Sequence, residues 1–200
     1  MGHREDLLAG AKRCLYERGY ARTTARDIVA ASGTNLASIG YHFRSKEALL
    51  NAAMTEAIEE WGEEFRRDLA ATIDPTATPI ERFESIWTGM IAAFDTHQPL
   101  WIATFEALAQ AQHSPELRSF LADSLQEGRL GLAALFQNSD AADQKRAQAV
   151  GSLYQALMSG LIVQWVIDPE RAPSGHDLAE ALRTILGNTQ PGVVADDIQD

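Results

Sequence analysis

The side chains most able to do chemistry in this sequence lie close together near its beginning, between Thr34 and Lys46. This stretch carries hydroxyl, amide, phenol, imidazole and ammonium groups. Such groups recognise polar partners by hydrogen bonding, and the ammonium group also attracts anions. What they can bind depends on the elements that hold them and on the direction in which they point.

Elsewhere in the chain the reactive side chains form no catalytic pattern. The five histidines are scattered, at His3, His42, His97, His113 and His176. No Ser-His-Asp or Cys-His grouping and no spacing typical of metal ligands accompanies them. Cys14 is the only cysteine, and its apolar neighbours predict a small buried side chain. We therefore expect no catalytic residue, no metal site and no cofactor.

The charge of the chain is unevenly distributed. The 200 residues carry a net charge of −11. Residues 1–50 nevertheless hold eight Lys or Arg against five Asp or Glu, whereas residues 51–200 hold nine against 23. A basic segment on an acidic body is typical of proteins that contact nucleic acid through the basic part. The carboxylates Glu59, Glu60, Glu63 and Glu64 recur at helical spacing and are expected to form a solvated acidic face.

Composition also indicates where the protein works. Hydrophobic residues make up 46% of the chain. No apolar run reaches the length of about 18 residues that indicates a membrane span. The N-terminus lacks the basic and then apolar pattern of a signal peptide. We expect a cytoplasmic protein with no membrane partner.

Nearly every segment carries helix signals, and none carries the alternating pattern of a strand. Capping residues such as Thr24, Ser45 and Thr78 mark helix starts, and Gly19 and Gly187 mark helix ends. We predict an all-α protein of about nine helices. They cover about residues 4–17, 24–31, 35–42, 46–73, 79–96, 100–112, 114–138, 140–167 and 176–186.

The second and third predicted helices are only about eight residues long, so packing must hold them, because helices this short are marginal alone. The side chains expected to bury against the apolar face of the first helix are Ile28, Leu36, Ile39 and Phe43. Ser32, Gly33 and Thr34 would form a tight turn between the two helices. This is the layout of a helix-turn-helix unit, whose second helix enters the DNA major groove.

Three motifs give this unit a family resemblance: GYARTT at residues 19–24, DIVAASG at 27–33 and YHFRSKEAL at 41–49. With this spacing, residues 4–50 resemble the DNA-binding domain of TetR (tetracycline repressor) family transcriptional regulators. The stretch LMSGLIVQWVIDP at residues 157–169 is more weakly similar to the eighth helix of many such regulators. Between these regions the chain matches only in helix count and length.

The resemblance implies a homodimer whose N-terminal domains bind a palindromic operator in double-stranded DNA. It also implies that the C-terminal helices form a ligand pocket and a dimerising four-helix bundle. The chain would then divide into a three-helix helix-turn-helix domain at residues 1–47, a larger helical ligand-binding and dimerisation domain at 48–188, and a flexible tail at 189–200.

Physical roles can be assigned to the polar stretch. Thr24 at a helix N-terminus can present its hydroxyl and nearby N–H groups to a phosphate, and Lys46 lies poorly for the dipole of its own helix but well for a phosphate. Tyr41 and His42 can donate to the DNA backbone. The short side chains expected at the groove floor are Thr34, Asn35, Ala37, Ser38 and Gly40. Gly40 stands where the family usually has tyrosine, so Tyr41 is the expected substitute anchor.

Large apolar side chains predict a cavity in the C-terminal body. They share single faces of three predicted helices, as Trp87, Met90 and Phe94, as Trp101 and Phe105, and as Tyr154 and Met158. If these faces converge, they line a mostly apolar site for a small apolar or aromatic effector. Any one of these residues is by itself more often part of a core.

The last two predicted helices are the expected dimer interface. The residues assigned to it are Leu157, Leu161 and Trp165 of the eighth helix and Leu178, Leu182 and Ile185 of the ninth. Gly160 would allow the helices to approach closely. Two helices from each copy would give a four-helix bundle with two-fold symmetry. Tyr154, Met158 and Trp165 fit either the cavity or the interface.

The sequence therefore predicts a ligand-responsive repressor that binds its operator as a homodimer and is released by an effector. One alternative is a DNA-binding regulator or activator without a small-molecule ligand. A second is an all-helical enzyme in which the helix-turn-helix unit is only a structural resemblance.

Overall fold

The computed structural model describes residues 2–72, 74–136 and 144–187. Within these ranges the chain forms nine α-helices and one short 3-10 turn, with no strand. The helices are α1 (His3–Arg18), α2 (Ala25–Ser32), α3 (Leu36–Phe43), α4 (Lys46–Thr72), α5 (Pro79–Thr96), α6 (Gln98–Gln110), α7 (Pro115–Phe136), α8 (Gln144–Ile167) and α9 (Gly175–Gly187). The predicted all-α fold is confirmed.

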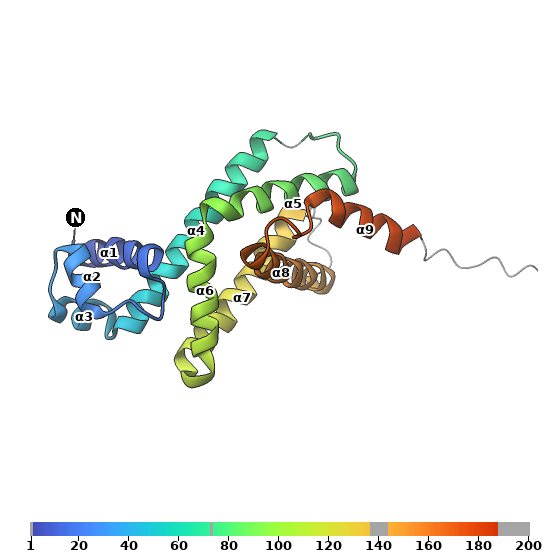
Figure 1. Ribbon diagram of the computed structural model, residues 1–200. Coiled ribbons are helices and arrows are strands. Elements are labelled where there is room, and N and C mark those ends of the chain that lie inside the picture. The colour runs from blue at the N-terminus through green and yellow to red at the C-terminus, as the bar shows by residue number, and fades with distance from the viewer. Residues whose placement is uncertain (1, 73, 137–143, 188–200) are drawn as a thin grey trace, which may run out of the picture.

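The helices form two parts that α4 connects (Figure 1). The head consists of α1, α2, α3 and the first turns of α4. The body consists of the rest of α4 together with α5 to α9. Helix α6 runs beside the head and packs on α1, so the two parts touch at a second place besides α4. In the body α7 packs along α8, and α5 packs along α9.

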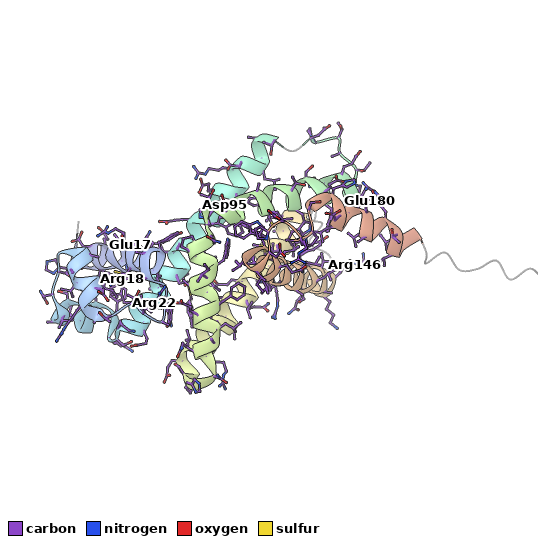
Figure 2. All side chains as sticks on the ribbon, viewed as in Figure 1. Glu17, Arg18, Arg22, Asp95, Arg146 and Glu180 are labelled. Atoms are coloured by element: carbon purple, nitrogen blue, oxygen red, sulfur yellow. The ribbon has the colours of Figure 1, made fainter. Side chains whose placement is uncertain are left out.

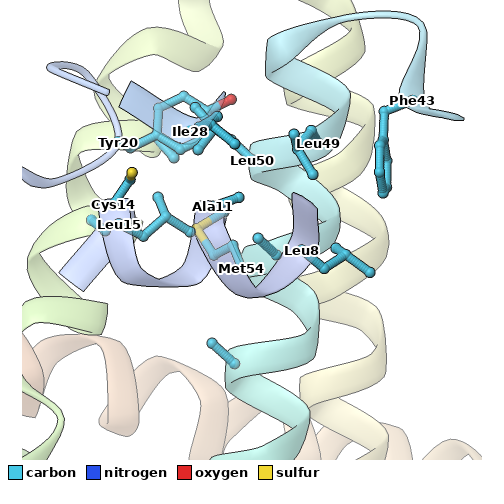
Figure 3. Close-up of a cluster of buried hydrophobic side chains, with 14 of the residues drawn as sticks. Leu8, Ala11, Cys14, Leu15, Tyr20, Ile28, Phe43, Leu49, Leu50 and Met54 are labelled. Carbon is cyan, nitrogen blue, oxygen red and sulfur yellow. The ribbon is translucent and has the colours of Figure 1, made fainter. Parts of the chain in front are cut away.

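One buried apolar cluster holds the head together (Figure 3). Leu7 of α1, Ile28 of α2 and Leu50 of α4 are all fully buried in it. Leu100 and Ala107 of α6 belong to the same cluster and are also fully buried. The head core therefore includes part of the body, which fixes how the two parts sit against each other.

The short helices of the head also have the end contacts that the sequence predicts. At the start of α2, the backbone N–H of Asp27 donates to the Thr24 hydroxyl at 3.2 Å, and the Asp27 carboxylate accepts from the Thr24 N–H at 2.9 Å. Asn35 caps α3 by accepting from the Ser38 N–H at 3.0 Å, and Ser45 caps α4. Gly33 ends α2 with φ of 67°, a conformation that glycine adopts without strain.

Leu36 departs from the predicted packing. Its side chain is 54% exposed, whereas Ile28, Ile39 and Phe43 are buried as predicted. Its spacing from Ile39 and Phe43 would put it on their face, but Leu36 is the first residue of α3 and stands at the end of the helix, where the head core does not cover it. The assignment of Leu36 to the head core is therefore wrong.

The junction between α5 and α6 is tighter than expected. Only His97 separates the two helices, and Pro99 lies in the first turn of α6 instead of in a break before it. A proline fits there because the first turn of a helix needs no backbone donor. Helix α6 ends at Gln110, and residues 111–113 form the 3-10 turn. The predicted cap at Asp140, the predicted helix end near residue 138 and the predicted tail at 189–200 lie outside the described residues.

The body has its own buried cluster, centred on α5. Trp87, Met90 and Phe94 are all fully buried in it. On the other side of the body, α7 and α8 approach backbone to backbone at Gly151, where a Cβ would collide with the carbonyl oxygen of Arg129. Only glycine allows this approach, so α7 and α8 form one closely packed pair.

Helix α8 is more apolar than the sequence analysis allowed. Within Lys145–Ile167 it contains an 18-residue window with a mean hydropathy of 1.4, so it is long and apolar enough to cross a membrane by length and composition alone. The expectation that no stretch reaches this level is wrong, because the polar residues that interrupt α8 lower its mean hydropathy too little. Core helices of soluble proteins pass the same test. Only 22% of the window is buried in this chain, so much of α8 is uncovered.

The packing of the head predicts a clear contrast between two substitutions. Ile28→Ala should lower the free energy of unfolding by about 2 to 5 kcal/mol, because it leaves a cavity in the head core. Leu36→Ala should cost less than about 1 kcal/mol, because that side chain is largely exposed. Circular-dichroism unfolding at equal protein concentrations would measure both. Equal losses for the two variants would contradict the outward position of Leu36.

Candidate nucleic-acid interface and ligand cavity

Helix α3 presents one exposed face to solvent. Leu36 and Tyr41 are 54% and 85% exposed, and Ala37 and Gly40 are exposed between them. Phe43 points the opposite way into the head core, with the Arg4 guanidinium 5.4 Å from its ring centre. A short helix with small side chains and one projecting phenol can enter a groove closely.

The polar residues at the start of α3 have different positions. Asn35 and Ala37 are exposed, but Ser38 is only 8% exposed. The Ser38 hydroxyl donates to the Asn35 side chain at 3.2 Å, and Thr34 shares a hydrogen bond of 2.7 Å with the Ser32 hydroxyl. Ser38 thus helps to hold the start of the helix and is not on the exposed face, which corrects its predicted position at the groove floor.

Thr24 and Lys46 lie next to each other although they are far apart in sequence. The Lys46 ammonium donates to the carbonyl oxygen of Thr23 at 3.1 Å and lies 3.3 Å from the Glu47 carboxylate. Thr24 is exposed and caps α2. Two helix N-termini, those of α2 and α4, therefore meet at one place with an ammonium group between them. Such an arrangement attracts phosphate.

Three arginines on the head were not among the predicted contacts. Arg22, Arg26 and Arg44 are all exposed, and none of them forms an ion pair with another described residue. Figure 2 shows Arg22 on the head, whereas Asp95 and Glu180 lie on the body. The basic balance of residues 1–50 was the available signal for these groups. The Arg22 Nε donates to the Arg18 carbonyl oxygen at 2.9 Å, and the exposed guanidinium groups of all three can approach a phosphate backbone.

Within the described residues, the body contains a cavity of about 1030 Å³. Its walls come from α4, α6, α7 and α8, and Met90 is the contribution of α5. Aromatic rings cover one side, where Trp61 of α4 and Trp101 of α6 meet edge to face with centroids 4.9 Å apart. The indole N–H groups of these two tryptophans are buried and have no acceptor among the described residues. An occupant with an acceptor atom would relieve a cost of about 1 to 3 kcal/mol for each group that it reaches.

The residues assigned to a ligand site divide into two groups. Met90, Trp101, Phe105 and Met158 line the cavity. Trp87 and Phe94 are fully buried in the body core, and Tyr154 packs its ring against Phe83 and Trp87. These last three side chains do not reach the cavity wall, which corrects their predicted role. The three predicted faces converge only in part, because α5 lies behind the cavity.

Sequence reasoning missed two walls of the cavity. Helix α4 contributes Trp61 and Phe65, which are four residues apart and therefore share a face. Helix α7 contributes Phe120 and the small residues Gly128 and Gly131. The aromatic spacing on α4 was visible in the sequence, but the neighbouring glutamates made this helix look like a solvated surface.

The residues assigned to the dimer interface also divide. Leu161 is 3% exposed and packs into the body of its own chain, so it is not available to a second copy in this conformation. Leu157, Trp165, Leu178 and Leu182 are half-buried against the body core. Ile185 is 60% exposed. Apolar side chains that the sequence analysis did not assign, Leu153, Val163 and Ile167, are exposed along α8.

Two comparisons with known families cover most of the chain. Residues 7–53 match bacterial regulatory proteins of the tetR family, and residues 78–188 match the tetracyclin repressor-like C-terminal domain. The chain belongs to the TetR family. It is thus a helix-turn-helix, DNA-binding transcriptional regulator, and the resemblance carried by the three N-terminal motifs is confirmed.

Individual relatives of this TetR-family chain agree with that assignment. It is 27% identical over 179 residues to the HTH-type transcriptional regulator BetI of Brucella anthropi, an alignment that covers 88% of this chain and 89% of BetI. It is 29% identical over 126 residues to the HTH-type transcriptional repressor KstR2 of Mycobacterium tuberculosis, covering 63% of this chain and 60% of KstR2.

The fold of this TetR-family chain is also similar to solved structures. The crystal structure of the multidrug binding protein EbrR complexed with imidazole superposes with a TM-score of 0.60 at 19% identity. The superposition covers 94% of this chain and 89% of EbrR. This likeness shows the shared fold alone.

Tyr41 offers a direct test of the interface in this TetR-family regulator. Tyr41→Phe should weaken DNA binding roughly tenfold or more, because the lost hydroxyl is expected to donate to a charged phosphate. The melting temperature should not change, because the ring is 85% exposed. Fluorescence anisotropy with a labelled duplex would measure the affinity.

Tyr16→Phe is the matched control for this test, because Tyr16 lies near the end of α1, whereas α1 contacts α3 through His3 and Arg4 at its start. It should bind DNA as the unmodified protein does. A Tyr41→Phe variant with unchanged affinity would remove Tyr41 as the phosphate anchor.

Proposed function

We propose that this protein is a ligand-responsive repressor, which binds a palindromic operator as a homodimer and leaves it when a small molecule fills the cavity of the body. One observation supports this most. Helix α4 starts at Lys46, next to the N-terminus of α2, and its residues from Met54 to Arg67 line the cavity without a break in the helix. A change at the cavity wall therefore reaches the head through one rigid element.

An ion-pair contact ties α4 to the head at the cavity. The Lys12 ammonium of α1 lies 2.8 Å from Glu56 and 2.7 Å from Glu60, and both glutamates line the cavity. Burial alone would lower the pKa of Lys12, but the hydrogen bonds to the two carboxylates outweigh it and raise the pKa above its ordinary value. Lys12 therefore stays charged at neutral pH. A ligand that moves α4 must also move α1.

Helix α6 provides a second connection. The Glu106 carboxylate accepts a hydrogen bond of 3.0 Å from the backbone N–H of Ala21, in the loop between α1 and α2. The preceding residue, Phe105, lines the cavity. One turn of α6 thus contacts both the ligand site and the head, and its displacement would turn α2 and α3 together with α1.

The energy needed for release is modest. A ligand that binds the released form a hundredfold better than the DNA-bound form shifts the equilibrium by about 2.7 kcal/mol. One more aromatic contact inside the cavity can supply an energy of this order, because burying such a side chain or ring contributes about 1.5 to 3 kcal/mol.

A second copy of the chain is the proposed cover for α8. Leu153, Ala156, Gly160, Val163 and Ile167 follow one another at spacings of three and four residues and form a stripe on α8. None of them is buried in this chain. A stripe of this spacing packs against another helix, and the small Ala156 and Gly160 permit close approach. The exposed Ile185 of α9 would extend the same interface, as the sequence predicted.

Two-fold symmetry would match the protein to a palindrome. The two copies of α3 would then have to lie about 34 to 36 Å apart, or a multiple of this distance, to enter successive major grooves. A small tilt of α4 in each copy changes this separation and removes the fit. We place the protein in the bacterial cytoplasm, where its operator is accessible, and keep residue 47 as the proposed domain boundary.

The proposal is tested by footprinting on the DNA upstream of the protein's own gene. We expect protection of two half-sites related by a dyad. The protection should disappear when an aromatic compound that binds the cavity is added, beginning with the neutral fluorescent probe N-phenyl-1-naphthylamine. Protection that no cavity-binding compound weakens would favour a regulator without a ligand. Absence of any protected site would count against the repressor.

Glu106→Ala tests the coupling in the same experiment. This variant should still bind the probe, but the probe should weaken DNA binding less, by about 1 to 3 kcal/mol of lost coupling. Glu106→Gln is the control, because its amide oxygen can still accept from the Ala21 N–H. If Glu106→Ala responds like the unmodified protein, the connection through α6 is not used.

The dimer is tested by Val163→Glu. An isologous interface brings the new charge of one copy close to that of the other, so sedimentation should show monomers. Leu36→Glu, an equally drastic change at an exposed leucine on the head, should leave the dimer intact. A dimeric Val163→Glu protein would exclude the α8 stripe from the interface.

A further inference from the structure

The cavity that is lined with aromatic rings also has an acidic wall. Six of its lining residues are glutamates and only two are arginines, Arg66 and Arg67. The glutamates are Glu56, Glu59, Glu60, Glu63, Glu64 and Glu127. Five of them lie on α4, so the helix expected to be a solvated acidic surface also faces the ligand space.

Three of these carboxylates already have a cationic neighbour. Lys12 lies between Glu56 and Glu60, and Arg66 is 2.6 Å from Glu63. Glu64 lies 3.9 Å from the imidazole of His97. Glu59 of α4 and Glu127 of α7 are different. Among the described residues neither of them has an ion-pair partner. The cavity therefore has two exposed carboxylates without an ion-pair partner among the described residues, one on α4 and one on α7.

The two arginines do not reverse this balance. Arg66 is bound to Glu63, and the Arg67 Nε donates to the Glu63 carbonyl oxygen at 3.4 Å. Glu59, Glu127 and the two arginines are all exposed, so water screens the negative and the positive charges alike. Because the lining holds six glutamates and only two arginines, the cavity as a whole still favours a positive over a negative ligand charge.

The aromatic side adds a second attraction for positive charge. Trp61, Trp101 and Phe105 line the cavity, and ring faces attract cations that have lost part of their water. Phe65 stacks on Trp61 with centroids 5.9 Å apart and extends this surface. Rings on one side and free carboxylates at the edge fit a ligand that is both hydrophobic and positively charged.

We infer that the effector is a hydrophobic organic cation, with its apolar part against Trp61, Trp101 and Phe105 and its charge near Glu59 and Glu127. This inference rests on the proposed function, because it names the class of ligand that the repressor senses. The volume of about 1030 Å³ is at the upper end of small-molecule sites, so a cation with several rings fits.

A pair of ions with the same shape and opposite charge tests the inference. Tetraphenylphosphonium and tetraphenylborate would each be titrated into the full-length protein without DNA, following binding by calorimetry and by the fluorescence of the cavity tryptophans. We expect the cation to bind at least tenfold more tightly than the anion. Equal affinity, a preference for the anion, or no binding of either ion would each overturn the inference.

Two variants test whether Glu59 and Glu127 are the carboxylates that lie near the positive charge of the ligand. Glu59→Gln and Glu127→Gln should each weaken tetraphenylphosphonium binding several-fold and leave tetraphenylborate unchanged or slightly tighter. Glu170→Gln is the control, because Glu170 is an exposed carboxylate between α8 and α9 that does not line the cavity. A cation preference that survives both variants would overturn the assignment to these two carboxylates.

Failure of the cation inference can be distinguished from failure of the repressor proposal. Binding is measured without DNA, so a cation preference together with absent operator protection would reject the repressor and keep the ligand class. Operator protection that is released by neutral compounds, together with equal affinity for the two ions, would keep the repressor and reject the ligand class.

Discussion

Helices of eight residues do not hold their shape in water, and the head depends on two of them. The first hydrogen-bonded turn of a helix is costly to form, and α2 and α3 each add only about one more turn to it. Their folded conformation therefore depends on burial against α1 and α4. Ile28 and Ile39 supply that burial from the short helices, and Leu50 supplies it from α4. The position of α3, the proposed DNA-facing helix, is thus set by α1 and α4, on which it packs, and a movement of α4 would also move α3.

Helix α4, which supports α3, also lines the cavity of the body. Helix α4 buries Leu49 and Leu50 in the head core and Phe65 in the body core, and the cavity lies between these ends. Two sites that share one rigid helix influence each other reciprocally, so a ligand that weakens DNA binding is itself bound less tightly by the DNA-bound form. The Lys12 and Glu106 contacts make the connection stiffer, since they hold the head to both helices at once.

Much of the fold was predictable from local signals. Thr24, Ser45 and Thr78 mark helix starts by side-chain chemistry that acts over three residues, and these elements begin where predicted. Ser38 was misplaced because one residue of rotation on a short helix moves a side chain from one face to another. Leu36 was misplaced because it stands at the first position of α3, where the head core ends. Trp87 and Phe94 were misplaced for another reason. Which aromatic stripe borders a cavity depends on the packing of distant helices, and no local pattern records it. The glutamates of α4 were recognisable in the sequence as an acidic surface. That they also line a cavity depends on the packing of α7 against α4, which no local pattern predicts.

The cavity has one stiff side and one that can yield. Where α7 and α8 meet at Gly151, backbone touches backbone, and no side chain is available to rearrange. The α7–α8 pair is therefore the rigid side of the cavity. In the proposed repressor, a molecule too large for the space would displace α4 and α6, which contact the head, more readily than it would separate α7 from α8. The close crossing at Gly151 would then give the response to ligand size a direction, towards the head.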